Sequence, residues 1–129
     1  MADIKDLTKK AAETLGKSKD AYLVLHEDSQ LSLLKQSAPS DHIATFYESA
    51  LCLILQGRKE VIAGQRSFGF GVGELLIISH EIPVVSKITE ASEAIPYIAL
   101  ILHLDKAIIR DLHDEFSGIA SKSGQVRSL

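Results

Sequence analysis

The sequence has few of the residues that build cross-linked or membrane-spanning proteins. It holds one cysteine, Cys52, in 129 residues, so no disulfide can form within the chain, and a reducing, cytoplasmic location is predicted. The longest apolar runs, at residues 50–55 and 97–102, are far shorter than the roughly 18 residues that a membrane span needs. The first residues, MADIKDL, are acidic and interrupted, so no secretory signal is expected.

An excess of positive charge is also missing. Lys and Arg number 14 against 17 Asp and Glu, which gives a net charge of −3 at pH 7. Because phosphate contacts need a basic face, this balance argues against direct nucleic-acid binding by these residues, and equally against a polybasic membrane anchor. The composition that remains, 46% hydrophobic and 24% charged, is typical of a single globular domain.

Short strands separated by turn residues dominate the middle of the sequence. Their spacing is close to the roughly 8–12 residues typical of sandwiches and barrels, and no helical segment lies between them, which disfavours a doubly wound α/β sheet. We therefore predict a mostly β barrel of about seven to nine strands. The predicted strands are residues 22–26, 31–36, 46–56, 59–63, 67–70, 75–79, 84–89 and 97–104. Several are apolar on both faces, so we expect the outer face to meet a second sheet or a partner.

A short amphipathic helix is predicted at residues 3–16, ahead of the strands, because apolar residues recur there at helical spacing and Gly16 follows as a stop. The chain accordingly divides into three parts within one structural domain. These are a helix and linker (1–20), a barrel (21–105), and a second helix with a polar tail (106–129).

The second helix, predicted at residues 106–116 with Asp105 as its N-cap, has a wide apolar stripe. The stripe consists of Ile108, Ile109, Leu112 and Phe116. It is wider than a helix that only closes a small barrel needs, so we predict that it packs in a homodimer. The alternative is that these side chains close the end of their own barrel.

No arrangement of catalytic residues is evident, and we predict that the domain is not an enzyme. Gly69, Gly71 and Gly73 superficially match a dinucleotide-binding loop, but a strand follows them where that loop requires a helix. They are interpreted as a turn. Cys52 lies in an apolar strand without a recognisable base and is interpreted as a packing residue.

The sequence supplies two of the three ligands that a common type of metal site needs. His103 and Asp105 lie two residues apart at a strand end and so face one way, as two ligands of a 2-His-1-carboxylate iron site would. A second histidine is missing, since His113 belongs to the following helix and His80 is flanked by isoleucine at positions 78 and 82. We therefore predict no metal and no other cofactor.

Three segments together carry a recognisable pattern: YESALCLILQGRKEVIAG at 47–64, GELLIISHEIPV at 73–84 and EASEAIPYIALILHLD at 90–105. On these segments the sequence resembles the amino-terminal, cupin-like domain of AraC-type transcriptional regulators, which precedes a helix-turn-helix domain. The matching positions are Gln56, Gly57, Lys59, Val61, Gly64, Pro83, Val84, Ala91, Ser92, Pro96, Tyr97 and Asp105. The sequence departs from the family at Glu48-Ser49, where Glu-Pro is common. The 129 residues do not include the family's DNA-reading helices, so we expect either an excised domain or a protein without a DNA-binding part of its own.

The resemblance implies a cupin-like β-barrel, a double-stranded β-helix with flanking N-terminal and C-terminal helices. It implies a regulatory domain that senses an unknown small-molecule effector, dimerises, and reaches DNA only through a C-terminal helix-turn-helix domain missing from this sequence. We expect the effector in the barrel lumen, lined by Cys52, Ile54, His80, Tyr97 and His103. The alternatives are a metal-dependent cupin enzyme that uses His80 or His103, and a stand-alone small-molecule-binding cupin protein.

Overall fold

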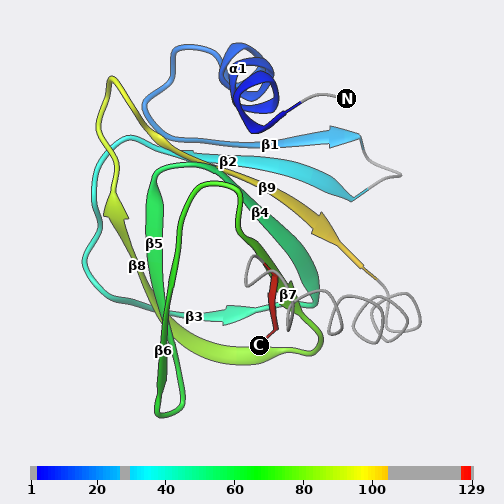
Figure 1. Ribbon diagram of the computed structural model, residues 1–129, viewed down its shortest axis with the longest axis vertical. Coiled ribbons are helices and arrows are strands. Elements are labelled where there is room, and N and C mark those ends of the chain that lie inside the picture. Colours follow the sequence, from blue (N-terminus) through cyan, green and yellow to red (C-terminus); the bar gives the residue numbers. More distant parts are fainter. Residues whose placement is uncertain (1–2, 27–29, 105–125, 129) are drawn as a thin grey trace.

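The computed structural model of the chain describes residues 3–26, 30–104 and 126–128 (Figure 1). Within these residues one helix precedes ten strands. The elements are α1 (Ile4–Leu15), β1 (Ala21–His26), β2 (Leu31–Gln36), β3 (Ile43–Tyr47), β4 (Ala50–Gln56), β5 (Arg58–Ala63), β6 (Arg66–Phe70), β7 (Leu75–Ile78), β8 (Ile82–Glu90), β9 (Tyr97–His103) and β10 (Val126–Ser128).

The strands form two sheets that enclose one core. The six-stranded sheet has the order β1-β2-β9-β4-β7-β10, and the four-stranded sheet has the order β3-β8-β5-β6. Neighbouring strands are antiparallel, except that β10 runs parallel to β7. The chain passes repeatedly from one sheet to the other, and the two sheets together form the barrel (Figure 1). The changes of sheet lie between β2 and β3, β3 and β4, β4 and β5, β6 and β7, β7 and β8, and β8 and β9. The prediction of a mostly β barrel is confirmed.

The strands differ from the prediction in two places. The predicted strand at 46–56 is two strands, β3 and β4, because the chain leaves one sheet at Glu48-Ser49 and enters the other. The described residues hold ten strands rather than seven to nine, since β10 forms in the segment predicted as a polar tail and pairs with β7. The predicted helix at 106–116 lies outside the described residues.

The six-stranded sheet has apolar side chains on both faces, and each face packs in a separate hydrophobic cluster. In β4, Cys52 and Ile54 belong to the core between the sheets, whereas Leu53 and Leu55 belong to a second cluster on the outer face. That outer cluster includes residues of α1, such as the buried Leu15. We expected a second sheet or a partner chain on this face, and the structure places the N-terminal helix of the same chain there (Figure 1).

Both ends of α1 are fixed by short-range hydrogen bonds. The carboxylate of Asp3 accepts a hydrogen bond from the backbone N–H of Asp6 at 2.9 Å, which satisfies a donor that the first turn leaves free. At the other end Gly16 has a φ of 75°, and its N–H donates to the carbonyl of Ala12. The helix predicted at 3–16 is therefore confirmed.

Polar contacts hold α1 on the sheet as well as apolar ones. The Thr8 hydroxyl lies 2.7 Å from the carbonyl oxygen of Ile4 in its own helix and 2.9 Å from that of Leu55 in β4, so its one proton is shared between the two. The ammonium group of Lys35 in β2 donates to the carbonyl of Gly16 at 3.1 Å, where the helix dipole favours a cation. Two separate strands thus hold the two halves of the helix.

The turn at Gly57 carries the chain from one sheet to the other. Gly57 has a φ of 83°, and a Cβ atom there would lie 2.6 Å from the carbonyl oxygen of Glu90 and 2.9 Å from the Cα of Tyr97. The side-chain amide of the preceding Gln56 donates to the carbonyl of Pro96 at 2.8 Å. The turn is therefore packed directly against the connection between β8 and β9.

We predict that Gly57→Ala lowers the free energy of unfolding by about 2–4 kcal/mol, because both the backbone conformation and the surrounding backbone oppose a side chain. Urea unfolding followed by circular dichroism measures this. Gly64→Ala is the matched control, since Gly64 has a φ of 63° but nothing within 4 Å of its added Cβ. Its loss should be about 1 kcal/mol. Equal losses for the two variants would contradict the close packing of Gly57.

Candidate functional site

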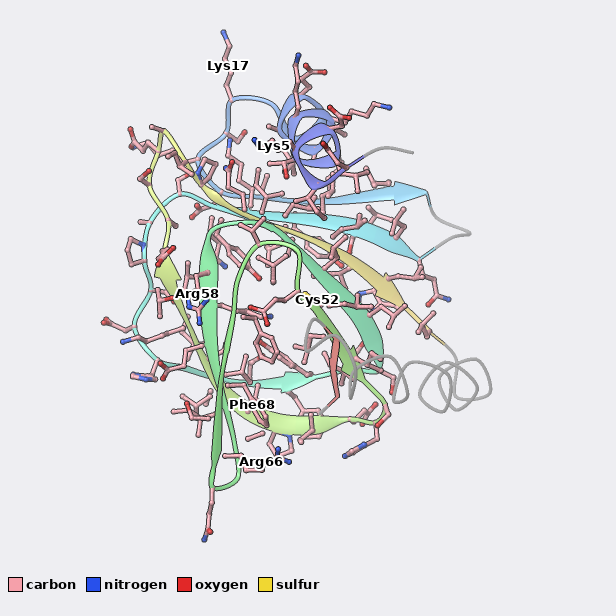
Figure 2. The ribbon with its side chains drawn as sticks, in the orientation of Figure 1. Lys5, Lys17, Cys52, Arg58, Arg66 and Phe68 are labelled. Carbon is pink, nitrogen blue, oxygen red and sulfur yellow. The ribbon has the colours of Figure 1, made fainter. Side chains whose placement is uncertain are left out.

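A cavity of about 350 Å³ lies at the end of the barrel where β4 begins and where β7 and β9 end. It is bounded by strands of both sheets. Its apolar and aromatic lining residues are Tyr22, Phe46, Ala50, Ile78 and Ile101, and its polar lining residues are Thr45, Tyr47, Glu48, Cys52, Lys59 and His103. Figure 2 shows the side chains that fill the barrel, with Cys52 on β4 among them.

Lys59 is the unusual residue of this cavity because it is a buried lysine. Strand alternation explains its position, since Lys59 and Val61 share the inward face of β5 while Arg58 is exposed. Only 8% of Lys59 is exposed, compared with 0% of Val61. The sequence thus places a cation at a core position of the four-stranded sheet.

The ammonium group of Lys59 contacts residues from both sheets. It donates to the Tyr47 hydroxyl at 3.3 Å and lies 4.0 Å from the Cys52 sulfur, at the outer limit of a hydrogen bond to sulfur. It also lies 5.0 Å from the centroid of the Tyr47 ring, where the face of the ring attracts a cation. A single side chain therefore joins β5 to β3 and β4.

Burial and the neighbouring acidic groups shift the pKa of Lys59 in opposite directions. Burial on its own lowers the pKa of Lys59, but Cys52, Tyr97 and Tyr47 act in the opposite direction, because negative charge on any of them favours the ammonium form. The net effect is a raised pKa for Lys59. Burial also raises the pKa of the Tyr97 phenol, against the opposing effect of the Lys59 charge. Near neutral pH the site therefore holds an ammonium ion beside an uncharged Tyr97.

A histidine and a carboxylate lie close together at the rim of the cavity. The Nδ1 atom of His103, at the end of β9, is 3.9 Å from a carboxylate oxygen of Glu48. The Glu48 side chain is 72% exposed and the His103 side chain 32%. The pair is screened by solvent, so it contributes little to stability and leaves the Glu48 carboxylate at the mouth of the cavity.

The structure separates the five predicted effector residues into three groups. Cys52 and His103 line the cavity. Ile54 and Tyr97 are almost completely buried in the core beside Cys52 and are not among the lining residues. His80 is exposed in the turn after β7, where its Nδ1 lies 3.1 Å from the hydroxyl of the adjacent Ser79. A role for any of them in binding remains a prediction.

Sequence reasoning missed Lys59 and Tyr47 as cavity residues. Lys59 was matched only as a family position, and Tyr47 was assigned to a strand without a role. The period-two pattern of Lys59 and Val61 could have shown that the lysine faces inward. No comparable signal exists for Tyr47, because its place opposite Lys59 depends on how β3 pairs with β8.

The glycine pattern considered as a nucleotide loop is a turn, and the described residues form no metal site. The Gly71 N–H donates to a carboxylate oxygen of Glu74 at 3.0 Å, and the Glu74 N–H donates back to the Gly71 carbonyl, which confirms a turn before β7. In the described part of the chain, no three His, Cys, Asp or Glu side chains lie close enough to hold a metal ion. Asp105 lies outside the described residues.

Among the described residues, no helix is both long and apolar enough to cross a membrane.

Comparison with known proteins gives one family match and several structural similarities. The family described as "AraC-type transcriptional regulator N-terminus" matches residues 29–128. No curated protein matches the chain. The cupin domain of Schizosaccharomyces pombe Cnp3 is similar in structure, with a TM-score of 0.50 and 16% identity over 72% of this chain and 69% of that one.

Two further solved structures are similar at lower scores. A Rhizobium leguminosarum protein of unknown function has a TM-score of 0.48 and 12% identity over 81% of this chain and 98% of its own. The Clostridium difficile EutQ protein has a TM-score of 0.46 and 12% identity over 73% of this chain and 80% of its own.

These findings agree with the geometry of the barrel. The similarity to the Cnp3 domain supports the cupin fold, and the family match covers all the strands from β2 onwards. Residues matched to the family from the sequence meet in space, since Gln56 bonds to Pro96 and Gly57 packs against Tyr97. The fold is the predicted cupin-like barrel, and the chain belongs to the family of AraC-type transcriptional regulator N-termini.

Proposed function

We propose that the chain is the regulatory domain of an AraC-type DNA-binding transcriptional regulator and that it binds a small-molecule effector inside its barrel. The observation that carries the proposal is the cavity of about 350 Å³ between the two sheets. Its volume falls within the range of roughly 300–1,000 Å³ that small-molecule sites occupy. Its lining is mixed in the way such sites require, with apolar walls and a few polar groups.

The position of the cavity suggests how an effector would influence the rest of the protein. His103, a lining residue, is the last residue of β9 and lies directly before the segment in which the helix at 106–116 is predicted. A ligand that contacts His103 would therefore act on the chain where that helix starts. The stripe of Ile108, Ile109, Leu112 and Phe116 is proposed to form the dimer contact, so occupancy and self-association would be linked.

We further propose that the domain binds its effector without transforming it and does not contact DNA itself. The Cys52 thiol is almost completely buried, with 4% of the residue exposed, and buried thiols are generally unreactive. The net charge of −3 supplies no excess of basic residues for phosphate contacts. Contact with DNA is therefore assigned to a helix-turn-helix part of the regulator.

We predict that Thr45→Trp blocks effector binding by filling the mouth of the cavity. Thr45 is exposed on β3 and lines the cavity, so a large ring fits there with little change to the core. A thermal-shift screen of small molecules against the wild-type chain measures binding. A ligand at 100 times its Kd stabilises by about 2.7 kcal/mol, or roughly 10 °C in Tm, and these shifts should disappear in the variant.

Ala44→Trp is the matched control for this screen. Ala44 is also exposed on β3, but it lies outside the cavity lining, one residue from Thr45. This variant should retain every shift seen with the wild-type chain. Ligands that stabilise Thr45→Trp as strongly as the wild type would show that binding occurs elsewhere, which would refute the proposed site.

We predict that Leu112→Glu combined with Phe116→Lys converts a dimer into a folded monomer. Charged side chains at both positions would have to be withdrawn from water in the dimer contact, which opposes association even though the two can pair with each other along the helix. Sedimentation velocity reports the mass, and circular dichroism reports whether the barrel remains folded. An unchanged dimer, or loss of the fold, would show that the stripe serves only its own barrel.

The control for this experiment is Arg110→Glu combined with Asp114→Lys. These residues lie on the opposite face of the predicted helix, and the exchange leaves the net charge unchanged, as the test variant does. The control should sediment as the wild type does. A monomer in the control as well would mean that altered charge alone dissociates the dimer.

A further inference from the structure

We propose that the effector is a small organic carboxylate with an apolar body, bound in the cavity with its carboxylate against the ammonium group of Lys59. This inference rests on the proposed effector function and adds the chemical class of the ligand.

Lys59 is a buried positive charge without a negative partner among the described residues. Only 8% of it is exposed, and none of the ion pairs found in the described part of the chain includes it. Withdrawing an ammonium ion from water is unfavourable unless an anion or several strong acceptors replace the water. A ligand that carries a negative charge would supply what the protein itself does not.

The acceptors that face Lys59 are weak ones. The Tyr47 oxygen lies 3.3 Å away and the Cys52 sulfur 4.0 Å away, both longer than a charge-assisted hydrogen bond of roughly 2.7–2.9 Å. The buried phenol of Tyr97 stays protonated because burial raises its pKa. A carboxylate oxygen would bind the ammonium group more strongly than any of these groups, so the site favours an anionic ligand over a neutral one.

The number of charges around the cavity indicates a single anionic group. Among the described residues that line the cavity, Lys59 is the only lysine or arginine. Glu48 places a negative charge at the rim that would repel a second anionic group on the ligand. Phosphates are generally held by arginine forks or by several converging donors, which this lining lacks. A monoanionic carboxylate therefore fits better than a phosphate ester.

The apolar lining residues of the cavity determine which body the carboxylate ligand carries. Phe46, Ala50, Ile78 and Ile101 present carbon surface to the cavity. The volume of about 350 Å³ has room for a small aliphatic or cyclic body, and burying that body adds a favourable hydrophobic contribution. The ligand class is thus an apolar acid of modest size.

Isothermal titration calorimetry with the full chain at neutral pH tests this inference. The probes are hexanoate, octanoate and cyclohexanecarboxylate, each compared with its primary amide, which has the same shape but no charge. We expect at least one acid to bind, and its amide to bind at least 10-fold more weakly. This comparison uses the wild-type chain and so does not depend on the folding of a variant.

Lys59→Met is the corresponding variant, because methionine retains most of the length of the side chain and removes the charge. It should weaken binding of the acid roughly 10- to 100-fold and leave binding of the amide unchanged. Lys35→Met is the matched control: Lys35 is also a mostly buried strand lysine, but it contacts Gly16 on the outer face of the sheet. This control should bind the acid as the wild type does.

The possible failures are distinguishable. If the amide binds as tightly as the acid and Thr45→Trp abolishes both, the cavity is an effector site but the carboxylate inference is wrong. If no acid binds, the inference is also wrong. If acids bind equally to the wild type and to Thr45→Trp, both the inference and the proposed function are wrong.

Discussion

Strands β2, β4 and β9 carry apolar side chains on both faces, so both faces of their sheet must be kept from water. The inner face packs against the four-stranded sheet and the outer face against α1. The inner face also borders the cavity, through Ala50, Cys52 and Ile101. The helix, the barrel and the cavity thus all depend on one two-sided hydrophobic sheet.

The cavity and the turn at Gly57 are two parts of one arrangement. Gly57 packs against the Cα of Tyr97, and two residues later Lys59 reaches the space between the sheets beside the Tyr97 phenol. The close turn fixes where β5 begins, and strand alternation then directs Lys59 inward. Several positions that resemble the family in sequence therefore act together: they set the backbone path that places a cation in the barrel.

Much of the fold could be predicted from the sequence because it depends on local patterns. Alternating apolar residues and turn glycines identified most strands, and Gly16 identified the end of the helix. The sheet break at Glu48-Ser49 was missed because apolar and aromatic residues continue across it, so only tertiary pairing reveals two strands. The site was harder for the same reason: the meeting of Lys59 with Tyr47 depends on the register of three strands, which no short segment encodes.

The placement of α1 also has a kinetic consequence. A helix of 12 residues is about the minimum length for partial stability on its own, so α1 needs its docking surface in order to persist. That surface includes Ile98 and Leu100 of β9, which are more than 80 residues further along the chain than Leu15. Pairings this distant in sequence form slowly, because a long loop must close before they contribute stability. The docking surface of the first element of the chain is therefore complete only once β9, a strand from the far end of the barrel segment, has joined the sheet.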